Sequence, residues 1–121
     1  MDGANTILNE TEKYENLTLI PFAGAMGAEI NGVDLGNLDD KTFDDLYAAW
    51  LRHHVIVLRN QNITPEQQIE FAHRFGDIHH HPFMRGMDEY PDILEIVKEP
   101  GSSYTFGAAW HTDQMFNPEP A

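Results

Sequence analysis

Residues 39–59 read DDKTFDDLYAAWLRHHVIVLR and join an amphipathic helix directly to a short β-strand. The first part carries apolar side chains at the i, i+3, i+4, i+7 and i+8 spacing of one helix face: Phe43, Leu46, Tyr47, Trp50 and Leu51. Acidic residues at its start and basic ones at its end, including His53 and His54, suit the helix dipole. Residues 55–58 are apolar and mostly β-branched, which predicts a buried strand.

Two short strands are predicted before this helix. Residues 17–22 and 28–35 contain β-forming side chains and are separated by a Pro- and Gly-containing turn. Residues 1–16 are polar and lack a periodic pattern, so we expect a flexible leader followed by one ordered domain at residues 17–121.

A second helix is predicted after the strand. Thr64 and Gln67 have the spacing of a capping box, Pro65 suits the first helical position, and Gly76 suits the end. A His-rich loop follows, and residues 93–97 predict another strand.

Composition excludes several classes of function. The chain has 20 acidic residues against 7 Lys and Arg, for a formal charge of -13, so we expect no nucleic-acid partner. It has no Cys, which favours a reducing cytoplasm over a disulfide-forming compartment. No apolar run has the length of a membrane span, so no membrane partner is expected. Whether the chain forms homo-oligomers is left open.

His111-Thr112-Asp113 is the strongest candidate for a functional site. In a strand, residues two apart point to the same face, so this segment would present an imidazole and a carboxylate side by side. Non-haem iron(II) oxygenases bind their metal with two His and one carboxylate. A lone His-x-Asp arises easily by chance in a chain with seven His, so the motif needs context.

Five segments supply that context because they occur in the order seen in the taurine dioxygenase (TauD/TfdA) family. They are residues 27–35, 51–59, 63–68, 75–76 and 110–113, which read GAEINGVDL, LRHHVIVLR, ITPEQQ, FG and WHTD. The chain therefore resembles the N-terminal portion of an iron(II)- and 2-oxoglutarate-dependent dioxygenase of this family. The resemblance implies an α+β, mainly β fold: an incomplete double-stranded β-helix (jelly roll) with two flanking helices.

The resemblance also implies roles for individual residues. His111 and Asp113 match the first His and the carboxylate of the iron-binding triad, and Trp110 would pack beside the site. His81 matches the position where sulfonate-using members place a His against the substrate anion. Gly107 departs from the pattern of taurine enzymes, which have an Asn four residues before the motif His.

The implied reaction uses iron(II), O2 and 2-oxoglutarate to hydroxylate a small, anionic organic substrate, with release of succinate and carbon dioxide. In family members the second His ligand, a Thr that contacts 2-oxoglutarate and the Arg that binds its distal carboxylate lie further along the chain. No residue here matches them, so we expect a truncated copy that is inactive by itself.

Other interpretations remain open. The chain is alternatively a non-catalytic domain, or one completed by a partner that pairs with an open sheet edge. A zinc-dependent hydrolase would combine residues 79–81 with His111 and Asp113, because imidazole also suits zinc. Glu29 and Asp34 are expected to stabilise turns rather than to act in catalysis.

Overall fold

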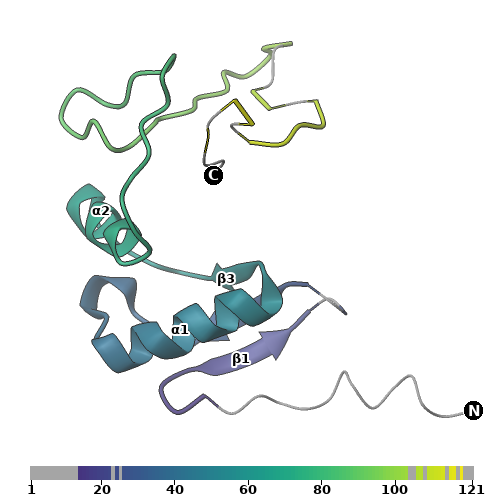
Figure 1. Cartoon of the computed structure of the whole chain (residues 1–121), viewed down its shortest axis with the longest axis vertical. Helices are drawn as coiled ribbons and strands as arrows, with labels where there is room; N and C mark the ends of the chain where they lie inside the picture. The colour runs from purple at the N-terminus through teal and green to yellow at the C-terminus, as the bar shows by residue number, and fades with distance from the viewer. Residues whose placement is uncertain are drawn as a thin grey trace, which may run out of the picture. The chain divides into compact units, whose positions relative to one another are not determined.

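The computed structural model describes residues 14–22, 24, 26–103, 106–107, 109–113, 115–116 and 118. The chain divides into two compact units, residues 1–67 and 68–121. In chain order its elements are β1 (Thr18–Pro21), β2 (Ala28–Asn31), the 3-10 helix η1 (Leu35–Asn37), α1 (Asp40–His53), β3 (Ile56–Leu58) and α2 (Pro65–His73) (Figure 1). The leader predicted at residues 1–16 lies mostly outside the described residues.

The first unit contains a three-stranded mixed sheet in the order β1-β2-β3. β1 and β2 are antiparallel, with Leu19 opposite Ile30. β2 and β3 are parallel, with Ile30 opposite Leu58, and α1 lies in the crossover that a parallel pair requires. The two strands predicted before the long helix, and the strand predicted after it, are confirmed.

Helix α1 forms where predicted and runs across the sheet in Figure 1. The predicted apolar face is only partly correct, because Tyr47 and Trp50 are each 37% exposed and Leu51 is 57% exposed. Phe43, Leu46 and Ala49 on one side of it are buried, and so are Leu19, Ala28 and Ile30 of the strands. The helix and the sheet therefore share one apolar core. At the start of the helix, the Asp39 carboxylate accepts a hydrogen bond from the backbone N–H of Thr42 at 2.7 Å.

The helix ends as predicted at two histidines. His53 is its last residue, and His54 adopts a positive φ of 63° while its N–H donates to the Trp50 carbonyl at 2.7 Å. This sharp turn lets β3 begin only two residues later. The expected burial of residues 55–58 is wrong, because β3 is half-buried and Val55 is 46% exposed. β3 is an edge strand of the described sheet, and only β2 pairs with it there.

Two glutamine side chains hold the loop that follows β2. The Gln61 amide donates to the Val33 carbonyl at 3.0 Å, and its oxygen accepts from the Leu35 N–H at 2.9 Å. The Gln67 amide donates to the Gly36 carbonyl at 3.1 Å. These contacts tie η1 to the segment after β3, through Gln61, and to the first turn of α2, through Gln67, about thirty residues further along the chain.

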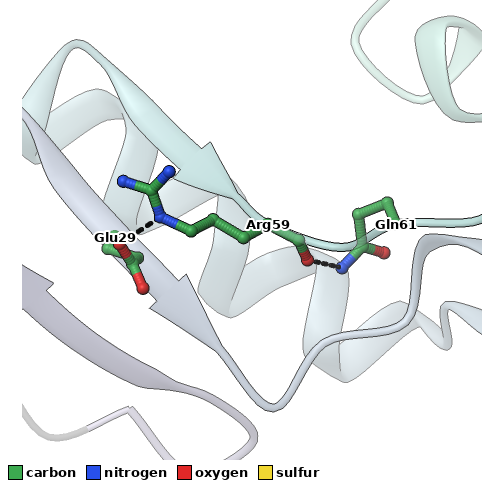
Figure 2. Close-up of polar contacts among 3 residues, drawn as sticks. All are labelled: Glu29, Arg59 and Gln61. Carbon is green, nitrogen blue, oxygen red and sulfur yellow. Dashed lines mark hydrogen bonds and ion pairs between the residues drawn. The ribbon is translucent and has the colours of Figure 1, made fainter.

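Figure 2 shows the polar contacts at the end of β3. The Arg59 guanidinium pairs with the Glu29 carboxylate at 2.7 Å, and the Arg59 carbonyl accepts from Gln61 at 3.1 Å. Of the two acidic residues expected to stabilise turns, Asp34 does so by accepting from the Gly36 N–H at 2.9 Å. Glu29 instead lies within β2 and links it to the chain after β3.

The capping box predicted for the second helix is confirmed. The Gln67 side chain accepts from the Thr64 N–H at 2.9 Å, and the Thr64 hydroxyl accepts from the Gln67 N–H at 3.3 Å. α2 ends at His73, three residues before the predicted end at Gly76. The intervening residues make i to i+3 hydrogen bonds, including Gly76 N–H to the His73 carbonyl, which tighten the last turn.

The described residues after α2 form turns and loops without a strand. The strand predicted at residues 93–97 is wrong: Ile96 and Val97 are 53% and 65% exposed, and no neighbouring strand pairs with them in this part of the structure. The described architecture is thus a small α+β unit, and the jelly roll stays a prediction. None of the helices in the described ranges combines the length and apolar character that crossing a bilayer requires.

Candidate functional site

His111 and Asp113 lie next to each other in the second unit. Nε2 of His111 is 2.9 Å from Oδ1 of Asp113, and the side chains are 54% and 73% exposed, so a ligand from solvent can reach both. The strand predicted for this segment is wrong, because His111 has no regular structure and Asp113 lies in a turn. A local turn, and not the alternation of a strand, brings the two groups together.

The carbonyl oxygen of Ala109 orients the imidazole of His111. Nδ1 of His111 lies 2.7 Å from this oxygen. A carbonyl only accepts hydrogen bonds, so Nδ1 carries the hydrogen and Nε2 is the nitrogen that faces Asp113. The Ala109 carbonyl, and next the charge of Asp113, raise the pKa of His111 above its ordinary value. In metal-binding histidines, the ring nitrogen that does not bind the metal commonly donates a hydrogen bond in this way, which fixes the orientation of the ring. A backbone acceptor leaves no pattern of side chains, so the sequence could not reveal the role of Ala109.

The geometry of the pair fits two adjacent positions around a metal ion. Two ligand atoms at about 2.1 Å from a metal and at right angles to each other are about 3 Å apart. Nε2 of His111 and Oδ1 of Asp113 are 2.9 Å apart. Across the described ranges, no three His, Cys, Asp or Glu side chains gather into a group that could hold a metal ion. In these ranges residues 79–81 do not gather with the pair as the zinc alternative expects.

A shallow hollow of about 330 Å³ borders His111 and is lined also by Gly107, Ala109 and Trp110. Trp110 was expected to pack beside the site; it lines this hollow, but its side chain is fully exposed. Gly107 adopts a φ of 68°, in the left-handed region that glycine favours and asparagine tolerates. A Cβ at this position would lie 3.7 Å from the His111 ring, which is ordinary contact.

His81 is half-buried and belongs to an aromatic cluster. Its Nδ1 accepts a hydrogen bond from the backbone N–H of Phe83 at 3.1 Å. Its ring centroid lies 6.0 Å from that of Phe83 and 6.5 Å from that of Phe116, three residues after Asp113. The structure thus brings His81 to the segment that carries the predicted metal ligands. Neither phenylalanine was predicted to lie near His81, because a contact between residues so far apart in the chain leaves no local pattern in the sequence.

His79 and His80 line a second hollow of about 390 Å³, which His81 also borders. This volume is within the range of sites for small molecules. His80 Nε2 lies 2.6 Å from the carboxylate of Asp92 in one wall. A Cβ on Gly86 would overlap the carbonyl of Pro91, so the loop that closes this hollow requires glycine there.

The chain is similar in sequence to a known protein family and to several of its members. Residues 18–121 match the family model described as taurine catabolism dioxygenase TauD, TfdA family. A (S)-phenoxypropionate/alpha-ketoglutarate-dioxygenase of Delftia acidovorans is 44% identical over 121 residues, covering 84% of this chain and 38% of that protein. An alpha-ketoglutarate-dependent sulfonate dioxygenase of Saccharomyces cerevisiae is 27% identical over 130 residues, covering 98% of this chain and 32% of that protein.

A solved structure is also similar. The crystal structure of a taurine dioxygenase from Burkholderia xenovorans superposes with a TM-score of 0.57 at 35% sequence identity, over 63% of this chain and 28% of that chain. The chain spans between 32% and 38% of the length of the curated relatives it matches.

Proposed function

Because this chain belongs to the taurine catabolism dioxygenase TauD/TfdA family, we propose that it is the N-terminal part of an iron(II)- and 2-oxoglutarate-dependent dioxygenase. The observation that carries the proposal is the pairing of His111 with Asp113, with the His111 ring held by the Ala109 carbonyl. The similar proteins named above are alpha-ketoglutarate-dependent enzymes, which supports the choice of cosubstrate.

His111 and Asp113 would provide two protein ligands to the metal. The Nδ1–H of His111 stays on the Ala109 carbonyl, which keeps the lone pair of Nε2 available, and binding of a cation releases the proton that Nε2 otherwise shares with Asp113. When bound, iron(II) with 2-oxoglutarate and O2 supplies the oxidising chemistry that hydroxylates substrate and yields succinate and carbon dioxide. The second His ligand and the Arg that binds 2-oxoglutarate match no residue of this chain, so we propose that residues 1–121 alone do not turn over substrate.

The substrate we propose is a small organic anion, held in part by His81. Its Nδ1 is occupied by the Phe83 N–H, so in the neutral ring the hydrogen is on Nε2, and Nε2–H is a donor for an anionic oxygen. Relatives are named for acting on phenoxypropionate and on sulfonates, both of which carry anionic oxygen atoms. The jelly-roll fold, the single domain at residues 17–121 and a cytoplasmic location complete this proposal.

A partner-completed domain is the second candidate. It is favoured by the finding that, in the ranges that the structure describes, only two potential ligands gather at the site and no group of three does. In this case a second copy of this chain would supply the third ligand. An iron(II) titration by calorimetry on the purified 121-residue chain separates the two: tight one-to-one binding would favour a site that this chain completes with its own copies, and weak binding favours the N-terminal part of an enzyme.

The main test is a coupled turnover assay on the protein that carries this chain. We expect succinate to form in proportion to substrate oxidised, and His111→Ala and Asp113→Ala each to abolish it. His73→Ala is the matched control, because His73 is an exposed histidine of α2 outside the site. Unchanged turnover in both site variants would exclude the assignment.

A further inference from the structure

The outer side of α1 carries apolar side chains that the core of the first unit leaves in solvent. Tyr47 is 37% exposed and Leu51 is 57% exposed. These two residues lie one helical turn apart, so their side chains adjoin on the surface of the helix. Ala48, which follows Tyr47, is also exposed, and its side chain is a single methyl group. A second helix can therefore approach α1 closely at this point.

Opposite charges stand on either side of Ala48 in one row along the helix. Asp44 lies one turn before Ala48 and Arg52 lies one turn after it, and both are exposed. Eight residues of helix separate the two charges by about 12 Å, which is too far for an ion pair within one copy. The helix dipole accounts for an acidic start and a basic end, but not for the exposure of Leu51.

We propose that α1 is a contact surface between two copies of this chain, which pack antiparallel across a two-fold axis at Ala48. In this arrangement each residue before Ala48 faces the residue that lies equally far after Ala48 in the second copy. Asp44 of each copy then faces Arg52 of the other, so the symmetry produces two ion pairs. A parallel arrangement would set Asp44 against Asp44 and Arg52 against Arg52. The order of the charges therefore favours an antiparallel second copy, and this inference does not rest on the proposed function.

The expected dimer is weak. A contact along the 14 residues of α1 is about 21 Å long, which is short for the roughly 800 Å² that each partner buries in a stable complex. The formal charge of -13 on each copy opposes association. At physiological salt, however, charges further apart than about 8 Å are largely screened, while the facing pairs are closer than that. We therefore expect a dissociation constant in the micromolar range.

Cross-linking through an introduced cysteine tests the position of the axis, because the chain contains no Cys. Two helices packed side by side hold facing Cα atoms about 5 Å apart, which is within the range of a disulfide. Ala48→Cys in the protein that carries this chain should therefore give a disulfide-linked dimer under mild oxidation. Lys41→Cys is the matched control, since Lys41 is exposed on the same helix but would lie about 20 Å from its counterpart across the axis.

Sedimentation velocity of the same protein tests the charges. Asp44→Arg and Arg52→Glu each set like charges against each other twice, so we expect each to raise the dissociation constant of the dimer about tenfold or more. The variant that carries both changes restores opposite charges and should return to within about twofold of the wild-type value. Glu70→Arg is the matched control, because Glu70 is an exposed acidic residue of α2, and it should leave dimerisation unchanged.

Circular dichroism establishes that each variant folds. A protein that stays monomeric at millimolar concentration would overturn the proposed contact, and so would a dimer that neither single charge reversal weakens. A double variant that dimerises no more tightly than the single variants would contradict the pairing of Asp44 with Arg52. Equal cross-linking of Ala48→Cys and Lys41→Cys, or none from Ala48→Cys, would contradict the two-fold axis at Ala48.

Discussion

The imidazole of His111 is held between the Ala109 carbonyl and the Asp113 carboxylate, and its Nε2 lies 2.9 Å from Asp113. This arrangement is complete within five consecutive residues. It therefore does not depend on the jelly-roll strand in which the pair was expected to lie.

The pKa of His111 provides a direct measure of this arrangement. A raised pKa means that the imidazolium form is favoured, so the ion pair with Asp113 is fully present below the ordinary pKa and is lost as the pH rises through the raised value. Asp113→Asn should lower the pKa of His111 without returning it to its ordinary value, because the Ala109 carbonyl is the larger cause. Titration of the histidine ring signals by NMR measures both values, and an identical pKa in the variant would contradict the ion pair.

Leu46→Ala should destabilise the first unit by about 2–5 kcal/mol, because Leu46 is fully buried and its truncation leaves a cavity between α1 and the sheet. Chemical denaturation monitored by circular dichroism measures the loss. Leu51→Ala is the control, since Leu51 lies on the same helix and is 57% exposed; the expected change there is within about 0.5 kcal/mol. Equal effects of the two changes would show that the helix does not pack as described.

Asp39→Ala removes the N-cap of α1, whose carboxylate accepts from the Thr42 N–H. We expect a loss of about 1 kcal/mol in the free energy of unfolding, as is usual for an N-cap. Asp44→Ala changes an exposed aspartate inside the same helix and should leave stability unchanged or slightly higher, since alanine is the better helix former. A loss confined to the Asp44 variant would contradict the assigned cap.

Gln61→Leu should loosen the loop after β2, because it removes the partners of the Val33 carbonyl and the Leu35 N–H. We expect the free energy of unfolding to fall by about 1–2 kcal/mol and the backbone amide of Leu35 to exchange its hydrogen faster. Gln68→Leu, at an exposed glutamine, is the control. Unchanged exchange at Leu35 in Gln61→Leu would show that the side chain does not hold the loop.

The sequence predicted the elements whose signals are local. The 3.6-residue spacing of Phe43 and Leu46 identified α1, and the capping box of Thr64 and Gln67 identified the start of α2. A strand differs because it requires a neighbour. Residues 93–97 have the composition of a strand but no pairing strand in the described part of the chain, and this long-range requirement is not visible in a short segment.

For the candidate site too, the sequence predicted the local motif but not the contacts that orient it. The motif identified His111 and Asp113, and the structure brings their side chains together through a turn. The contacts that orient the site were not predictable. The Ala109 carbonyl is a backbone group, and the approach of Phe116 to His81 joins residues 35 positions apart in the chain.

An anaerobic iron(II) titration of the chain, followed by NMR of the histidine side chains, measures whether His111 and Asp113 bind a ferrous ion. Paramagnetic iron broadens signals of nearby nuclei. We expect the His111 signals to broaden first, those of His73 to stay sharp, and Asp113→Ala to remove the broadening at the same iron concentration. Broadening at residues 79–81 while His111 remains sharp, or an unchanged response in Asp113→Ala, would contradict it.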